Sequence, residues 1–259
     1  MLGAIAGDVI GSVHEFLGEK TVDFPLFVQH SRFTDDSVLT IAVADCLLTR
    51  NSYVDKFREY ARAYPNRVYG AGFWAWVQSA SRVPYNSWGN GAAMRVSPVG
   101  FAFDTLEDVL REARECAEVT HNHPEGVRGA QATAVAIFLA REGETKDAIR
   151  TTIQDRFGYD LGRTIDEIRP DYAFNESCQG TVPEAITAFL DASDYEETIR
   201  LAISLGGDAD TLACIAGGIA EAFYGGVPKD IEEKTMAVLD DNLRQTVQRF
   251  RATYLNLAS

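Results

Sequence analysis

Two short acidic stretches in this sequence combine paired carboxylates with hydroxyl groups. Each stretch stands directly before a run of small apolar residues, 38–48 in one case and 212–224 in the other. The oxygen-bearing side chains of the two stretches are Thr34, Asp35, Asp36, Asp208, Asp210 and Thr211. Clusters made only of oxygen ligands suit Mg²⁺, Mn²⁺ or Ca²⁺ better than Zn²⁺. Adjacent carboxylates repel each other unless a cation or hydrogen-bond donors compensate them.

A single stretch of this kind is also typical of an ordinary helix start. A hydroxyl or carboxyl group caps the first backbone N–H groups, and acidic residues are favourable at the positive end of the helix dipole. The glycine pair 206–207 would then be a turn before the second helix. Because the same combination occurs twice, we interpret the two stretches as halves of one two-metal site, in which the ions orient substrate oxygens and activate water.

Residues 2–17 are predicted to form an apolar helix that carries a further acidic group. Its glycines recur at intervals of four and leave a smooth stripe along which another helix can approach closely. These glycines are Gly3, Gly7 and Gly11. Asp8, Ser12 and Glu15 share one face of the predicted helix. An acid in such surroundings is either paired or functional, and both interpretations are open for Glu15.

A loop rich in glycine and amide groups precedes the short predicted helix 92–95. Its residues are Ser87, Trp88, Gly89, Asn90 and Gly91. A loop of this composition exposes backbone N–H groups at a helix start, which suits a phosphate, although a plain turn has the same composition. It is not a Walker loop, since no Gly-Lys-Ser/Thr follows. His121 and His123 lie in another loop without cysteine neighbours, so a zinc site is not expected there.

Helical periodicity extends through most of the chain, and strand signals are almost absent. The other predicted helices span 35–49, 53–63, 71–80, 104–118, 126–140, 145–154, 196–205 and 211–224, with one long helix from Pro228 to about Tyr254. Residues 19–33 and 155–180 are predicted loops, and Thr181 is the candidate cap of the helix that follows the second loop. We therefore expect one all-α domain over residues 1–259.

The composition excludes several classes of protein. The net charge of −14 disfavours nonspecific binding to nucleic acids and to anionic membranes. The four cysteines are widely spaced, which favours a reducing, cytoplasmic location without disulfides. The apolar N-terminal stretch has no basic region before it and contains Asp8, so it is not expected to be a signal peptide. No apolar run is long enough for a membrane span.

Taken together, the motifs resemble the ADP-ribosylglycohydrolase family, which includes dinitrogenase reductase-activating glycohydrolase and the hydrolases of ADP-ribosylarginine and ADP-ribosylserine. The resemblance covers nearly the whole chain and keeps the family order. The blocks that carry it are 7–16, 34–37, 88–95, Thr120-His121, 177–183 and 206–211. It implies a compact orthogonal helical bundle with a binuclear Mg²⁺ or Mn²⁺ site held by the six residues of the acidic stretches.

The resemblance also implies roles for the remaining candidate residues. Glu15 would lie beside the metal centre and the scissile ribose, and either Glu15 or Asp35 would be the catalytic acid or base. The loop from Ser87 to Gly91 would hold the diphosphate and ribose of ADP-ribose, with His121 nearby. Trp88 stands where relatives often have Tyr, which keeps a flat side chain and loses a phenolic hydrogen bond.

The implied activity is hydrolysis of the glycosidic bond between ADP-ribose and an acceptor, reversing ADP-ribosylation. The expected substrate is an ADP-ribosylated protein or small-molecule conjugate, the expected product is free ADP-ribose, and we expect a monomer. The acceptor stays open among arginine, serine, a DNA base and a metabolite. Two alternatives are a two-metal phosphohydrolase and a non-catalytic relative that binds ADP-ribose.

Overall fold

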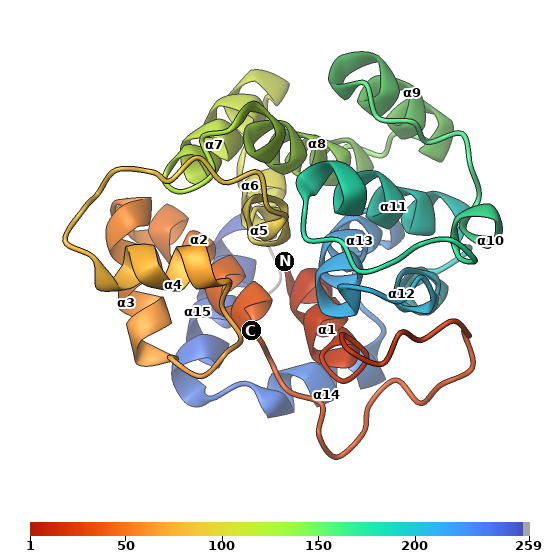
Figure 1. Ribbon diagram of the computed structural model, residues 1–259, viewed down its shortest axis with the longest axis horizontal. Helices are drawn as coiled ribbons and strands as arrows, with labels where there is room; N and C mark the ends of the chain where they lie inside the picture. The colour runs from red at the N-terminus through yellow and green to blue at the C-terminus, as the bar shows by residue number, and fades with distance from the viewer. Residues whose placement is uncertain (256–259) are drawn as a thin grey trace.

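The computed structural model describes residues 1–255 as an array of helices, labelled α1 to α15 (Figure 1). No strand forms in this described part, where the only β-type pairing is an isolated antiparallel bridge between Gly89 and Ser177. The helices are α1 (Leu2–Gly11), α2 (Asp35–Thr49), α3 (Tyr53–Ala63), α4 (Ala71–Gln78), α5 (Gly91–Met94), α6 (Ser97–Ala102), α7 (Leu106–Glu118), α8 (Pro124–Arg141), α9 (Lys146–Phe157), α10 (Ile165–Ile168), α11 (Cys178–Asp191), α12 (Tyr195–Ser204), α13 (Ala209–Tyr224), α14 (Lys229–Val238) and α15 (Asp241–Tyr254). The predicted all-α class is confirmed.

Helices α1 and α13 pack against each other through the predicted glycine stripe, near the middle of the array (Figure 1). A Cβ atom on Gly7 would lie 2.1 Å from the carbonyl oxygen of Ala213, and a Cβ atom on Gly11 would lie 2.5 Å from Cα of Asp210. Such distances are too short for any side chain, so the contact requires glycine at both positions. The close approach places the C-terminal end of α1 beside the first turn of α13.

Helix α1 is shorter than predicted, because it ends at Gly11 rather than at residue 17. The Ser12 hydroxyl turns back to donate to the carbonyl of Val9 at 2.9 Å, and the N–H of His14 bonds to the carbonyl of Gly11 at 2.7 Å. Tight turns of this kind replace the helical pattern up to residue 18. Glu15 therefore lies on a turn and does not share a helical face with Asp8.

The segment before α11 also differs from the prediction. Ser177, not Thr181, caps this helix, since the Ser177 side chain accepts a hydrogen bond from the N–H of Gly180 at 3.2 Å. The Thr181 hydroxyl instead donates to the carbonyl of Asn175 at 2.9 Å. The predicted loop 155–180 contains the short helix α10, which a capping box at its start stabilises.

The C-terminal segment forms two helices instead of the predicted single one. Extended backbone at Leu239 and Asp240 separates α14 from α15. The Asp240 carboxylate accepts a hydrogen bond from the N–H of Leu243 at 3.0 Å and so begins a new helix. This break was missed because both helices share an amphipathic pattern, and a capping aspartate inside such a pattern resembles any exposed acid.

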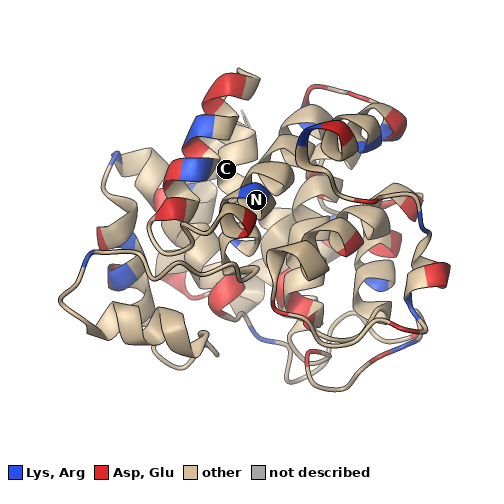
Figure 2. Ribbon diagram, turned by 45° about the horizontal axis from the view of Figure 1, so that its top comes forward, with Lys and Arg blue, Asp and Glu red and all other residues tan. Residues whose placement is uncertain are grey.

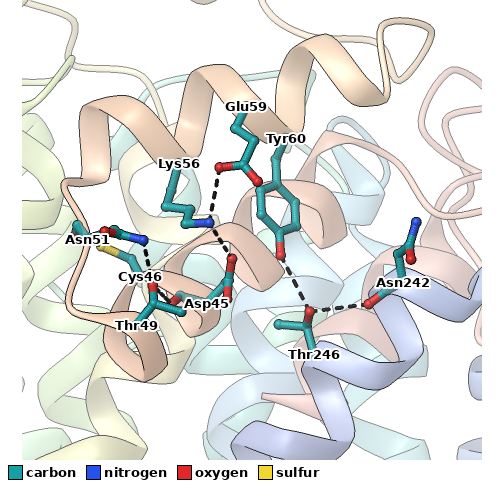
Figure 3. A network of polar contacts seen from close by, with 9 residues as sticks. All are labelled: Asp45, Cys46, Thr49, Asn51, Lys56, Glu59, Tyr60, Asn242 and Thr246. Carbon is teal, nitrogen blue, oxygen red and sulfur yellow. Dashed lines mark hydrogen bonds and ion pairs between the residues drawn. The ribbon is translucent and has the colours of Figure 1, made fainter.

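A polar network joins α2, α3 and α15 (Figure 3). The Lys56 ammonium group is largely buried and donates to Asp45 at 2.8 Å and to Glu59 at 3.0 Å. The hydroxyl groups of Tyr60 and Thr246 lie 3.4 Å apart and connect α3 to α15. A buried ammonium needs such carboxylate partners, so this network fixes how the three helices meet.

Acidic residues are spread over most of the helices rather than gathered on one face (Figure 2). Within residues 1–255, none of the helices combines the length and the hydrophobicity needed to cross a bilayer.

Candidate active site

The two acidic stretches, far apart in the sequence, meet at the N-terminal ends of α2 and α13. The Thr211 hydroxyl donates to a carboxylate oxygen of Asp36 at 3.5 Å. Asp8, Asp36 and Asp210 each bring a carboxylate oxygen within 4.8 Å of the other two. This proximity follows from the close packing of α1 on α13, which carries Asp8 towards the start of α13.

A second group of carboxylates overlaps with the first. Glu15, Asp208 and Asp210 also have carboxylate oxygens within 4.8 Å of one another. Asp210 belongs to both groups, so the two groups are adjacent and share one residue. Two adjacent carboxylate groups of this kind could hold two divalent cations side by side.

The two helix starts differ in how they use their first residues. Thr34 caps α2, since its side chain accepts a hydrogen bond from the N–H of Asp36. Asp208 occupies the corresponding position of α13 but makes no capping hydrogen bond. The carboxylate of Asp208 instead accepts a hydrogen bond from the side-chain amide of Asn90 at 2.6 Å. Thr34 is thus an ordinary helix cap, as one interpretation of the sequence expected, whereas the Asp208 side chain faces the other acids.

Asp8 organises the start of α2, a role that sequence reasoning missed. Its buried carboxylate accepts hydrogen bonds from the N–H of Thr34 at 3.0 Å, from the Thr34 hydroxyl at 2.6 Å, and from the N–H of Ser37 at 3.1 Å. The Ser37 hydroxyl donates to the same carboxylate. The only sequence signal was an acid inside an apolar helix, which does not identify its partners.

The carboxylates are held in an environment that disfavours their charge. Burial, followed by the charge of neighbouring carboxylates, raises the pKa of Asp35, Asp36 and Asp210 well above its usual range. Burial and the nearby Asp208 raise the pKa of Glu15 to about 7. One buried carboxylate oxygen of Asp36 and one of Glu15 have no hydrogen-bond partner among the described residues. Orphaned hard oxygens of this kind fit divalent cations as partners.

These acids line a cavity of about 480 Å³. The predicted site residues that line it are Glu15, Asp35, Asp36, Asp208, Asp210, Thr211, Ser87, Gly89, Asn90, Gly91 and His121. Thr34 and Trp88 do not line it. Trp88 is 53% exposed and borders a neighbouring hollow together with Tyr85 and Phe174. The structure thus brings the glycine-rich loop to the acids, with Trp88 on its outer side.

The amide of Asn90 is committed to protein partners. It donates to Asp208 at 2.6 Å and to the Thr181 hydroxyl at 3.1 Å, and the N–H of Asn90 donates to the carbonyl of Glu176 at 2.8 Å. Asn90 therefore orients a carboxylate of the acidic cluster. A substitution at Asn90 would disturb that cluster as well as the loop.

The two histidines of the 120–123 loop have different surroundings. His121 is buried, and its Nδ1 atom lies 2.7 Å from the Thr120 hydroxyl. His123 caps α8, since its Nδ1 accepts a hydrogen bond from the N–H of Glu125 at 3.1 Å, and its ring lies 5.5 Å from that of Trp88. Only His121 belongs to the cavity.

The fold and the cavity define a helical protein whose oxygen-lined cluster fits divalent cations. The chain belongs to the ADP-ribosylglycohydrolase family, whose sequence pattern it matches over residues 1–257. It is 28% identical to human ADP-ribosylhydrolase ARH3 in an alignment that covers 87% of this chain and 84% of the relative. It is 26% identical to ADP-ribosylarginine hydrolase Tri1 of Pseudomonas putida in an alignment that covers 90% of this chain and 72% of the relative.

The fold is similar to that of a solved structure described as an ADP-ribosylglycohydrolase-related protein complex. The TM-score is 0.68 at 24% sequence identity, and the similarity covers 98% of this chain and 97% of the other. The similarity therefore includes the complete helical array and is not limited to the acidic cluster.

Proposed function

We propose that this protein is a divalent-cation-dependent hydrolase that breaks the glycosidic bond between ADP-ribose and an acceptor group. The observation that carries the proposal is that Glu15, both acidic stretches and the glycine-rich loop all face one cavity. The family membership and the names of the human and Pseudomonas relatives support the same reaction.

Two cations, Mg²⁺ or Mn²⁺, would be held by the overlapping carboxylate groups. Asp36 and Asp210 would hold one ion, while Asp208 and Asp210, with Glu15 close by, would hold the other. The remaining predicted ligands are Thr34, Asp35 and Thr211. When bound, the cations would supply a positive charge that orients the ribose hydroxyl groups and lowers the pKa of a water molecule.

The side chains of the chain itself provide the proton transfer. Hydrolysis adds water to the anomeric carbon of the ribose, breaks the bond from that carbon to the acceptor nitrogen or oxygen, and leaves the acceptor with a proton. A carboxyl group with a pKa near neutrality can both accept and donate a proton at physiological pH. Glu15 has such a pKa in the metal-free protein and lines the cavity, and Asp35 is the second candidate.

The two alternative functions have less support. A phosphohydrolase loop of the Asp-x-Asp-Thr type follows a buried strand, whereas helix α12 precedes the second acidic stretch here. A non-catalytic relative would be expected to have lost ligands, but carboxylates or hydroxyl groups occupy all the predicted ligand positions.

A panel of substrates tests the proposal and separates the three functions. The protein is incubated with ADP-ribosylated arginine, ADP-ribosylated serine peptides, ADP-ribosylated DNA and p-nitrophenyl phosphate, with Mg²⁺, with Mn²⁺ or after metal removal. We expect metal-dependent release of ADP-ribose from at least one conjugate and no phosphate release. Phosphate release alone would support the phosphohydrolase, and ADP-ribose binding without any turnover would support the non-catalytic relative.

A further inference from the structure

Arg95, which directly follows α5, is a fully buried arginine without an acidic partner. Its side chain has no exposed surface, and its guanidinium group lies over the ring of Phe57 at 4.4 Å from the centroid. Within residues 1–255, no carboxylate lies within ion-pair distance of it, and its Nε and Nη1 atoms have no hydrogen-bond partner. Burying an unpaired charge is costly, so its position calls for an explanation.

Arg95 is also the only lysine or arginine among the residues that line the acidic cavity. Its Nη2 atom donates to the carbonyl of Cys116 at 3.0 Å and to the Thr120 hydroxyl at 2.9 Å. Both acceptors are neutral, so the positive charge of Arg95 is not compensated. The contact to Thr120 links Arg95 to the neighbouring His121.

The hydroxyl of Thr120 connects Arg95 to the imidazole of His121. Thr120 is fully buried, and its Oγ1 lies 2.7 Å from Nδ1 of His121. Arginine is always a donor, so the Thr120 oxygen accepts from Arg95 and keeps one proton to donate. Nδ1 of His121 is the only other hydrogen-bond neighbour of this hydroxyl among the described residues. The Thr120 proton is therefore satisfied only if Nδ1 accepts it.

This arrangement fixes the protonation state of His121. A ring that accepts at Nδ1 carries its single proton on Nε2. Burial, together with the positive charge of Arg95, lowers the pKa of His121 well below its usual range, so the ring is neutral at physiological pH. The alternative tautomer would point an N–H at the Thr120 hydroxyl and leave the hydroxyl proton buried without an acceptor, which is unfavourable.

The Nε2 atom of His121 lies against the glycine-rich loop. A Cβ atom on Gly91 would lie 3.3 Å from this nitrogen, and a Cβ atom on Gly89 would lie 3.6 Å from it. No acceptor among the described residues bonds to Nε2, and both glycines line the cavity. Nε2 is thus without a protein partner among the described residues and adjoins the part of the cavity that Gly89 and Gly91 line.

We propose that Arg95 and Thr120 are positioning residues that hold His121 as the neutral Nε2–H tautomer, so that His121 donates a hydrogen bond to a ligand oxygen between Gly89 and Gly91. The ligand half of this inference rests on the proposed function, with a phosphate or ribose oxygen of ADP-ribose as the acceptor. The tautomer half does not depend on the ligand. The uncompensated charge of Arg95 favours an anionic group in this cavity, where the other charged lining residues are acidic.

A matched pair of variants at Thr120 tests whether its hydroxyl group fixes the tautomer of His121. Thr120→Val keeps the shape of the side chain and removes the hydroxyl, whereas Thr120→Ser keeps the hydroxyl. The ¹H–¹⁵N correlations of the imidazole rings are recorded on the full-length, Mg²⁺-loaded protein near pH 7.5, with His121 assigned from a His121→Gln variant. Wild type and Thr120→Ser should show the Nε2–H pattern, and Thr120→Val should show a mixture of tautomers.

The affinity for ADP-ribose provides the second measurement, by calorimetry on the same samples. We expect about tenfold weaker binding for Thr120→Val, because one hydrogen bond is lost. For Thr120→Ser, which keeps this hydrogen bond, we expect the affinity to change by less than about twofold. An Nδ1–H or doubly protonated His121 in the wild type would overturn the proposal that Arg95 and Thr120 hold the Nε2–H tautomer. An unchanged tautomer and an unchanged affinity in Thr120→Val would overturn it as well. If the wild type bound no ADP-ribose, the proposed function would fail, and the spectrum alone would still decide the tautomer.

Discussion

The hydroxyl of Thr211 lies 3.5 Å from the carboxylate of Asp36, although the two residues are 175 positions apart in the sequence. This contact joins the start of α13 to the start of α2. The glycine-mediated packing of α1 on α13 stabilises it, because Asp8 at the end of α1 binds Thr34 and Ser37 at the start of α2. The acidic cluster is therefore a product of helix packing rather than of one loop.

Substitutions of the acidic cluster should reduce the number of bound cations. Asp210 belongs to both carboxylate groups and Asp36 to one. We expect Asp210→Asn to abolish binding of both Mn²⁺ ions, and Asp36→Asn to remove one, as measured by calorimetric stoichiometry. Asp104→Asn, at a 99% exposed side chain, is the control and should bind as the wild type does. Equal stoichiometry in all four proteins would contradict a shared ligand.

Glu15→Gln should separate chemistry from folding. The substitution keeps the size of the side chain and removes its proton transfer, so the single-turnover rate should fall by about 10²–10⁴-fold at saturating metal. Saturation is needed because Glu15 lies within 4.8 Å of the Asp208 and Asp210 oxygens. The melting temperature should stay close to that of the wild type.

Glu176→Gln is the matched control for Glu15, because Glu176 also lines the cavity but belongs to neither carboxylate group. We expect its single-turnover rate to change by less than about threefold, because the free-energy effect of a substitution away from the reacting groups is small, on the order of 0.5 kcal/mol. A Glu15→Gln protein with a wild-type rate and a lowered melting temperature would show that Glu15 has only a structural role.

The metal-free protein should lose stability as the pH rises from 5 to 7. The pKa values of Asp35, Asp36 and Asp210 are raised in the folded state, and that of Glu15 is about 7. Above the pKa values of the unfolded chain, the folded state therefore binds more protons, and the free energy of unfolding decreases with increasing pH. Chemical denaturation in EDTA at several pH values measures this slope.

Asp36→Asn is the internal comparison for the pH experiment, because it removes one titrating carboxyl group and leaves the histidines unchanged. Its free energy of unfolding should decrease less steeply with pH than that of the wild type. Excess Mg²⁺ should flatten the wild-type slope, since a cation replaces the protons. A wild-type protein whose metal-free stability rises more steeply with pH than that of Asp36→Asn would refute this explanation.

Gly7→Ala should destabilise the protein strongly. The new methyl group would lie 2.1 Å from the carbonyl oxygen of Ala213, so α1 and α13 would have to separate. We expect a loss of about 3 kcal/mol in the free energy of unfolding, measured with urea in saturating Mg²⁺. Gly70→Ala is the control, because no atom lies within 4 Å of the added Cβ and the backbone φ is −54°. If Gly7→Ala lowered the free energy of unfolding no more than Gly70→Ala does, the close packing of α1 on α13 would not require glycine at position 7.

Sequence periodicity predicted most helices because their apolar spacing and caps are local signals. The glycine stripe on α1 was also predictable, since glycines in register have a cost that only close packing offsets. The end of α1 at Gly11 was not, because residues 12–17 contain no proline or glycine and the turns depend on the Ser12 hydroxyl. Glu15 was consequently assigned to a helix that does not reach it.

The partners of site residues were the least predictable feature. Asp8 binds Thr34 across 26 sequence positions, and Asn90 binds Asp208 across 118. Neither contact has a local pattern, because both arise where helices from different parts of the chain meet. The same holds for Trp88, whose position on the outer side of the loop follows from the path of the backbone.

The central claim is that the two acidic stretches form one centre for two cations. Anomalous scattering from crystals of the full-length protein soaked with Mn²⁺ measures this directly. We predict two peaks roughly 3.5–4 Å apart, one beside Asp36 and one beside Asp208, with Asp210 between them. Peaks that avoid these carboxylates, or a single ion bound by only one of the stretches, would contradict the claim.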